Sequence, residues 1–215
     1  MNISSILRVL FDAILPRKQR LMRTEERSLQ DIPLFPASHE LHGTQIVTIL
    51  DYRESAVAEL VQSLKYDSSS HAAKLCALLL ADYLHEEISS VRSFSSKSIL
   101  LVPVPLHKER VHERGFNQVE RVLQLLPPEF RDGQLSLLSE ALARTRATKQ
   151  QTRLSREARL RNVAGAFAVH DAAVVSNAHI FLIDDVVTTG ATLAEASKPL
   201  VRAGATVTLL ALARA

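Results

Sequence analysis

Two adjacent carboxylates, Asp184 and Asp185, have the residue type and setting that most directly suggest chemistry. They follow four apolar residues at 180–183 and precede two valines and a Thr-Thr-Gly-Ala-Thr sequence at 188–192. An unbroken apolar run is typical of a strand buried on both faces of a parallel sheet. Ligands of open α/β sheets bind at the carboxyl ends of such strands. The pattern therefore predicts a buried strand, a binding loop and a helix start, with both acids at the ligand-binding edge.

Each part of this stretch suits a sugar phosphate. Paired carboxylates can bind a ribose diol, a Mg²⁺ ion, or both. A turn at a helix start offers backbone N–H groups and threonine hydroxyls to a phosphate. Gly190 allows a positive φ and a close approach of the backbone. Together these residues predict a site for a ribose that carries a 5′-phosphate. The alternative is a core strand that ends in a solvated acidic turn with a threonine cap, but the order of all the parts favours the ligand site.

Two further segments concentrate positive charge. The first, at 106–117, follows an apolar strand that ends near Pro103 and Pro105, and its Arg110 and Arg114 would offer forked donors to a pyrophosphate. The second, at 144–161, holds seven Lys or Arg residues and a single acid. This composition predicts a mobile flap that closes over a polyanion. A nucleic-acid-binding arm and a solvated loop are the alternatives.

Hydrophobic periodicity predicts the elements that must hold these segments in place. We expect strands at 44–50, 98–104, 180–183 and 206–213, and helices at 56–65, 71–88, 117–126 and 193–202. Pro199 is expected to end or kink the last helix, and Gly204 suits its C-terminal cap. Strands that alternate with helices predict an α/β fold, a mostly parallel sheet flanked by helices.

Length and composition suggest one domain with an appendage. The chain has 215 residues and a net charge of +3. We divide it into an N-terminal appendage, 1–40, made of a helix at 3–14 and a proline-containing linker, and a main domain, 41–215. The single cysteine, Cys76, excludes an intrachain disulfide and a multi-cysteine zinc site, so no zinc is expected. No apolar run reaches the about 18 residues of a membrane span, and the first helix does not read as a signal peptide, so we expect a cytoplasmic protein.

Several of these motifs together resemble one protein family. The stretch at 180–192 resembles the phosphoribosyl pyrophosphate (PRPP) motif of type I phosphoribosyltransferases. The sequences Val-Pro-Val-Pro-Leu-His at 102–107 and Arg-Gly-Phe-Asn-Gln at 114–118 look like the signature of the ComF family. Further residues match the family's remaining patterns: Tyr52, Lys65, Tyr66, Arg144 or Arg146, Thr148, Gln150, Gln151, Arg159, Asn162, Gly165 and Phe167. The resemblance covers about 45–213 in the right order, but the cysteine-rich zinc module that usually begins these proteins has no counterpart in 1–40.

The resemblance implies a type I phosphoribosyltransferase fold and a link to DNA uptake during natural competence. It implies binding of PRPP with Mg²⁺ and transfer of a 5-phosphoribosyl group to an unidentified, nucleobase-like acceptor, with release of pyrophosphate. The implied catalytic residues are Asp184, Asp185 and Arg114, and the two acids would share the metal with PRPP. The implied PRPP-binding residues are Asp184, Asp185, Val187, Thr188, Thr189, Gly190, Ala191, Thr192, Pro105, Leu106, His107, Arg110 and Arg114. The implied flexible hood carries Arg146, Lys149, Arg153 and Arg159, whereas Lys65 and Tyr66 are assigned no role.

Two other functions stay open on the sequence alone. The chain could be a non-catalytic module that binds PRPP, a nucleotide or single-stranded DNA during DNA uptake, although it has no run of aromatic residues for base stacking. It could also be an adaptor whose helix at 3–14 docks a partner such as a competence protein. A homodimer is compatible with either, and the acceptor cannot be named from these residues.

Overall fold

The computed structural model describes residues 17–41, 43–107, 115–131, 135–146 and 163–215. The predicted helix at 3–14 lies outside these ranges. So do five residues of the predicted site: Arg110, Arg114, Lys149, Arg153 and Arg159. Across the described ranges, no helix combines the length and the apolar character needed to cross a bilayer.

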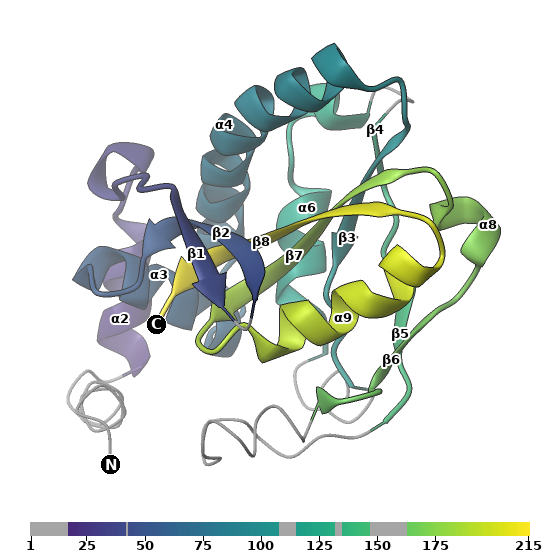
Figure 1. Cartoon of the computed structure of the whole chain (residues 1–215). Coiled ribbons are helices and arrows are strands. Elements are labelled where there is room, and N and C mark those ends of the chain that lie inside the picture. The colour runs from purple at the N-terminus through teal and green to yellow at the C-terminus, as the bar shows by residue number, and fades with distance from the viewer. Residues whose placement is uncertain (1–16, 42, 108–114, 132–134, 147–162) are drawn as a thin grey trace.

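Six strands form the central sheet, in the order β1-β2-β8-β7-β3-β4 (Figure 1). Their bounds are β1 (Ala37–Leu41), β2 (Thr44–Asp51), β8 (Thr206–Arg214), β7 (His179–Val187), β3 (Ile99–Pro103) and β4 (Leu135–Leu137). Neighbours from β2 to β4 are parallel, and only β1 runs antiparallel, at the edge beside β2. The predicted α/β fold with a mostly parallel sheet is confirmed.

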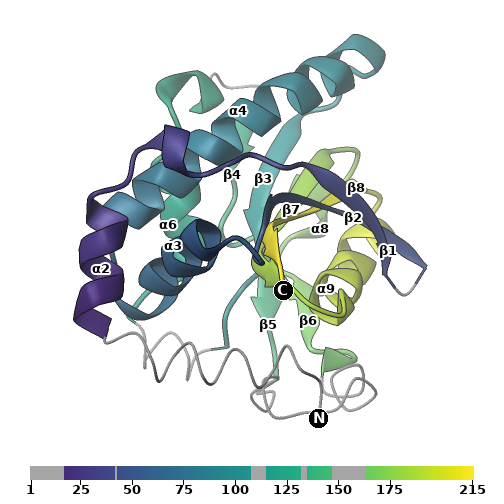
Figure 2. The same ribbon diagram turned by 90° about the vertical axis from the view of Figure 1, so that its left-hand side faces the viewer.

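Helices cover both faces of this sheet, as Figure 2 shows. On one face lie α3 (Ser55–Tyr66), α4 (Ser70–Phe94) and α6 (Gln118–Gln124), and on the other lie α8 (Ala172–Val175) and α9 (Ala191–Arg202). Strand β7 contributes to both cores. Phe181 and Ile183 pack with α3, α4 and α6, whereas Ile180 and Leu182 pack with α9, and all four are fully buried. Burial on both faces explains why this strand reads as an unbroken apolar run.

The described part of the N-terminal segment packs against the domain. Helix α2 (Arg17–Glu25) and a 3-10 turn (Leu29–Asp31) lead to Ile32, which is buried in the core, and then to β1. The charge of α2 has a partner in the domain, because Arg23 forms an ion pair with Glu59 of α3 at 3.2 Å. The predicted boundary between residues 40 and 41 falls inside β1.

Helix α9 reaches Arg202, as predicted, so Pro199 does not end it. It continues past Pro199 to its last turn, where Leu200 is fully buried. Packing of that turn outweighs the one backbone hydrogen bond that proline cannot donate. The predicted glycine cap is confirmed: Gly204 has a φ of 91°, and the Ala205 N–H donates to the carbonyl of Leu200 at 3.1 Å. This 6→1 bond belongs to the Schellman type of helix end.

Candidate functional site

The acid pair lies within the last part of β7, not after the strand. Backbone pairing with β8 places Asp184 opposite Ala211 and extends β7 to Val187, four residues beyond the predicted end. The sequence pattern predicted the end of the strand too early, because the two carboxylates interrupt the apolar run. The backbone pairing of β7 with β8 nevertheless continues to Val187. Successive side chains of a strand point to opposite faces. The two carboxyl groups therefore leave the strand in different directions.

Asp185 faces the helical layer that contains α3. Its Oδ2 atom lies 3.0 Å from the Nζ of Lys65, and the two side chains are only 15% and 17% exposed, respectively. Its other oxygen, Oδ1, accepts a hydrogen bond from the N–H of Val186 at 2.6 Å. The carboxylate is thus held both by a lysine from a distant part of the chain and by its own strand.

Asp184 has a different environment. Its Oδ1 accepts a hydrogen bond from the N–H of Asp185 at 2.8 Å. Burial, followed by the negative charge of Asp185, raises the pKa of Asp184 to about 7, against the opposite effects of Lys65 and Arg144. Asp184 also lines a shallow hollow together with residues 186–193. The structure therefore joins Asp184, rather than Asp185, to the threonine-rich turn.

The turn between β7 and α9 is shaped around Gly190. This residue caps α9 with a φ of 80°, so the predicted positive φ is confirmed. A Cβ atom at this position would lie 2.8 Å from both Ile46 Cδ1 and Leu41 Cβ. Glycine is required here by backbone conformation and by the close approach of β1 and β2. Glycine brings no capping side chain, and the Ala191 N–H donates to the Thr189 hydroxyl at 3.4 Å.

The end of β3 lies directly beside the acid pair. The Val104 N–H donates to the carbonyl of Ile183 at 2.8 Å, so the chain passes Asp184 as it enters the predicted pyrophosphate loop. The first residues of that loop, Pro105, Leu106 and His107, are half-buried. The structure thus brings the described start of this loop to the same sheet edge as residues 184–192, as the sequence predicted.

Asn117 closes this loop at its far end. Its Oδ1 accepts a hydrogen bond from the Val119 N–H at 3.0 Å and caps α6, while its Nδ2 donates to the carbonyl of Val104 at 3.0 Å. The side chain therefore ties the end of the loop to its beginning. Part of the Arg-Gly-Phe-Asn-Gln pattern is explained by this structural role.

The basic segment leaves and rejoins the described chain at a two-stranded ribbon, β5 (Leu142–Arg144) and β6 (Phe167–Val169). Arg144 lies over the Phe167 ring, 5.2 Å from guanidinium carbon to ring centroid, and its charge acts on Asp184. Arg146 is exposed and donates to the carbonyl of Ala164 at 2.8 Å. The structure therefore places Arg144 close enough to influence the acid pair electrostatically, and holds Arg146 at the base of the predicted hood.

Lys65 is a residue near the acid pair that sequence reasoning did not place in the site, because it was noted only as part of a family pattern. Arg144 was counted in the predicted basic flap, but its effect on Asp184 was not predicted. The signal for Lys65 was its position at the end of an amphipathic helix, but its partner lies in a strand far along the sequence. Such a pairing becomes visible only once α3 is packed on β7.

The donor set fits one kind of metal site. Across the described residues, no group of three or more His, Cys, Asp or Glu side chains lies together in a way that could hold a metal. Mg²⁺ is commonly bound through one or two carboxylates together with water and substrate phosphates. Because the two side chains point in different directions, each could give one carboxylate ligand to an ion that arrives with a phosphorylated substrate, and Asp185 is already paired with the ammonium group of Lys65.

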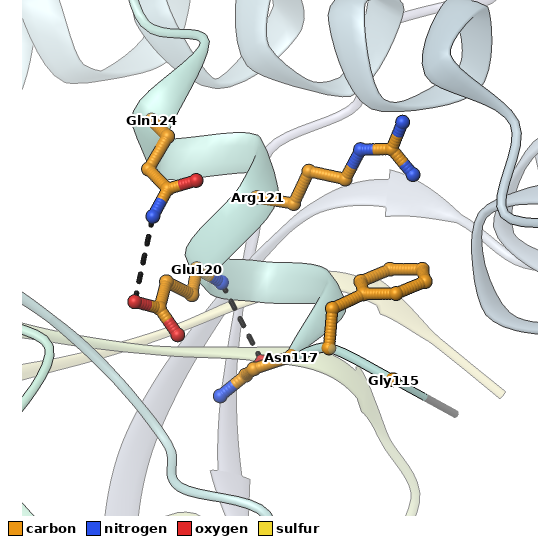
Figure 3. Close-up of a pocket in the computed structure, with 6 residues that line it drawn as sticks. Gly115, Asn117, Glu120, Arg121 and Gln124 are labelled. Carbon is orange, nitrogen blue, oxygen red and sulfur yellow. Dashed lines mark hydrogen bonds between the residues drawn. The ribbon is translucent and has the colours of Figure 1, made fainter. Parts of the chain in front are cut away.

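A larger hollow, of about 520 Å³, lies at the start of α6 (Figure 3). Its walls are Gly115, Phe116, Asn117, Glu120, Arg121 and Gln124. The guanidinium of Arg121 stacks over Phe116 and donates to the carbonyl of Ser68 at 2.9 Å and the hydroxyl of Ser70 at 2.6 Å. Volume alone does not make this hollow the reactive site, because its polar groups bond within the protein and it lacks a carboxylate pair. The smaller hollow is lined by Asp184 and the threonine-rich turn, which are the groups predicted to bind a sugar phosphate.

The chain is similar to bacterial proteins named for competence or DNA utilization. The DNA utilization protein YhgH of Escherichia coli K12 is 37% identical over 162 residues, which cover 75% of this chain and 67% of that protein. Competence protein F of Haemophilus influenzae is 36% identical over 108 residues, 48% of this chain and 44% of that protein. Competence protein ComFC of Bacillus subtilis is 29% identical over 157 residues, 73% of this chain and 53% of that protein.

Family models and solved structures give no further support for the family. No family model matches the chain. Among solved structures, an orotate phosphoribosyltransferase of Mycobacterium tuberculosis H37Rv, crystallised with Fe(III) dicitrate, superposes with a TM-score of 0.31 at 9% identity, covering 89% of this chain and 81% of that one. A superposition of this quality does not by itself establish a shared fold.

Proposed function

Because the chain belongs to the ComF family, we propose that it binds PRPP with Mg²⁺ at the carboxyl end of β7 and transfers the 5-phosphoribosyl group to a nucleobase-like acceptor. The observation that carries this proposal is the acid pair that ends β7 immediately before the glycine-capped start of α9. The parallel sheet directs β3 and β7 to the same edge, where ligands of α/β proteins bind.

Each part of the substrate is assigned to a different group of residues. The 5′-phosphate would lie at the start of α9, where the positive end of the helix dipole and the Thr189 hydroxyl favour an anion. The ribose hydroxyls would lie at Asp184, which lines the same hollow. The pyrophosphate would extend toward Pro105 and His107, beside the end of β3. We assign the remaining pyrophosphate contacts to Arg110 and Arg114, as proposed from the family pattern.

In the proposed reaction, the bond from C1 of the ribose to the pyrophosphate oxygen breaks and pyrophosphate leaves with the bonding electrons. A bond from C1 to an acceptor nitrogen forms, and the proton of that nitrogen passes to water. Bound Mg²⁺ would supply charge neutralisation for the departing pyrophosphate. Positive charge that develops on the sugar is favoured by the nearby carboxylates, which need no rearrangement during the step. Arg144, whose charge acts on Asp184, would stand at the start of the basic segment, and closure of that segment would exclude water from the sugar.

The experiment is calorimetric titration of the full-length protein with PRPP, with and without Mg²⁺. Wild-type protein is expected to bind only when Mg²⁺ is present, and Asp185→Asn should weaken binding at least about tenfold, or ~1.4 kcal/mol. Glu120→Gln, the same carboxyl-to-amide change in the α6 hollow, is the matched control and should bind as wild type. Equal affinity of wild type and Asp185→Asn would reject the proposed site.

Transfer needs its own assay. Pyrophosphate release from PRPP would be followed with a panel of purine and pyrimidine bases, in wild type and in Asp184→Asn/Asp185→Asn. If a base supports pyrophosphate release by the wild type but not by the double variant, that base is the acceptor. If PRPP binds with Mg²⁺ but no base causes pyrophosphate release, the protein is a PRPP-binding module and not a transferase.

A second candidate, single-stranded DNA binding, is supported by the names of the relatives, which concern competence and DNA utilization, and by the basic composition of 144–161. Fluorescence anisotropy with a labelled oligonucleotide across a salt series would test it. DNA binding through phosphates falls steeply with salt and should not depend on Asp185. Absence of binding at low salt would remove this candidate.

A further inference from the structure

We infer that Lys65 is a built-in counter-ion of the acid pair, one that a divalent cation must displace from Asp185 before it can bind there. This inference deepens the proposed function and rests on it for the identity of the natural ligand. It assigns a role to a residue outside the predicted site. It also gives the helix α2, from the predicted appendage, a part in positioning that residue.

The contact itself is well defined. The Nζ of Lys65 lies 3.0 Å from Oδ2 of Asp185, and both side chains are mostly shielded from solvent. Lys65 stands in the last turn of α3, whereas Asp185 belongs to β7, so the contact joins the helical layer to the sheet edge. The other Asp185 oxygen is already engaged by the backbone of Val186. A cation that approaches Asp185 therefore meets the oxygen that Lys65 occupies.

Coulomb repulsion makes the two occupants exclusive. A divalent ion and an ammonium group within a few ångströms of one oxygen repel each other strongly at a shielded site. Lysine suits a displaceable role because its charge sits on a long flexible stem and can move away. In the unliganded protein, Lys65 would keep the buried pair from carrying an uncompensated double negative charge. Removing it should make the site more attractive to a divalent cation.

Helix α2 holds the end of α3 from which Lys65 extends (Figure 2). Two residues beyond Lys65, the carboxylate of Asp67 receives hydrogen bonds from Arg20 at 3.0 and 3.2 Å. Nearly one helical turn before Lys65, the side-chain oxygen of Gln62 receives a third bond from Arg20, at 3.0 Å. The side chains of Arg20 and Asp67 are 7% and 1% exposed. Arg20 thus holds α3 by hydrogen bonds to one residue before Lys65 and one residue after it.

The test is titration with Mn²⁺ alone, followed by the electron paramagnetic resonance signal of the free ion, on the full-length protein. Lys65→Met should bind Mn²⁺ at least about tenfold more tightly than wild type. Lys74→Met removes an exposed lysine of α4 and serves as the control, with no expected change. Mn²⁺ affinity that is unchanged, weaker or undetectable in Lys65→Met overturns the inference.

Arg20→Lys tests the part played by α2, because it keeps the charge but loses the forked geometry. It should tighten Mn²⁺ binding about twofold to threefold in the wild-type background and have no effect in Lys65→Met. An equal effect in both backgrounds would show that Arg20 acts only on stability. PRPP binding separates this inference from the proposed function: tighter Mn²⁺ binding by Lys65→Met without any PRPP binding by wild type would reject the proposed function alone.

Discussion

Replacing Asp184 with asparagine should stabilise the protein, and more so as the pH rises. Burial and the neighbouring Asp185 raise the pKa of Asp184 from its ordinary value of 3.8 to about 7. The folded protein therefore keeps a proton on Asp184 at pH values where the unfolded chain has lost it. The stability associated with this proton is complete below about pH 4 and is lost as the pH rises through about 7. Asparagine is neutral at every pH and removes this loss.

The size of the effect follows from the pKa difference. At about 1.36 kcal/mol per pKa unit, the raised pKa of Asp184 costs about 4 kcal/mol of folding free energy at pH 8 and about 1.7 kcal/mol at pH 5. The difference of about 2.5 kcal/mol between the two pH values is an upper limit, because the same repulsion is shared with Asp185. We expect the advantage of Asp184→Asn over wild type to grow by about 1–2.5 kcal/mol between pH 5 and pH 8.

Urea unfolding followed by circular dichroism at pH 5 and pH 8 would measure this growth, without Mg²⁺ in the buffer. Asp82→Asn, which changes an exposed carboxylate on α4, is the matched control and should show no such growth. If Asp184→Asn is no more stable than wild type at pH 8, or if its advantage is larger at pH 5, the electrostatic reasoning about the acid pair is refuted.

Three other substitutions test the structure around the site. Gly190→Ala should lower the free energy of unfolding by at least about 2 kcal/mol, because the methyl group meets Ile46 and a positive φ is strained; urea unfolding checks this, and a wild-type midpoint would contradict it. Arg20→Met removes the shielded ion pair with Asp67 and should cost about 3–5 kcal/mol, seen as a large fall in melting temperature; a small fall would argue against the α2 contact. Asn117→Ala removes a helix cap and should cost about 1–2 kcal/mol in the same unfolding assay, whereas an unchanged value would contradict the capping role.

The sequence was sufficient for the elements that have strong local signals. The apolar runs of β2, β3, β7 and β8 and the amphipathic helices α3, α4 and α9 all occur close to the predicted positions. The short strands β1 and β4 were not predicted, because their five and three residues are too few for a periodic pattern to stand out. Their pairing depends on the neighbouring strands, β2 and β3, already being in place.

The candidate site was predictable in part. The acid pair, Gly190 and the threonine turn could be found because they form one continuous stretch. The different directions of Asp184 and Asp185 could not, since they depend on how far β7 pairs with β8. The same holds for Lys65, whose contact with Asp185 joins two segments that lie far apart in the sequence. The roles of Arg110 and Arg114 stay predictions, because both lie outside the described residues.

The most direct test is to titrate isotopically labelled protein with PRPP in the presence of Mg²⁺ and to follow the backbone amide resonances by NMR. Binding as proposed predicts the largest shifts at Thr189, Ala191 and Thr192, with smaller ones at Asp184 and at the end of β3. Shifts confined to the α6 hollow around Phe116, or no shifts at saturating PRPP, would contradict the proposal that the end of β7 is the PRPP site.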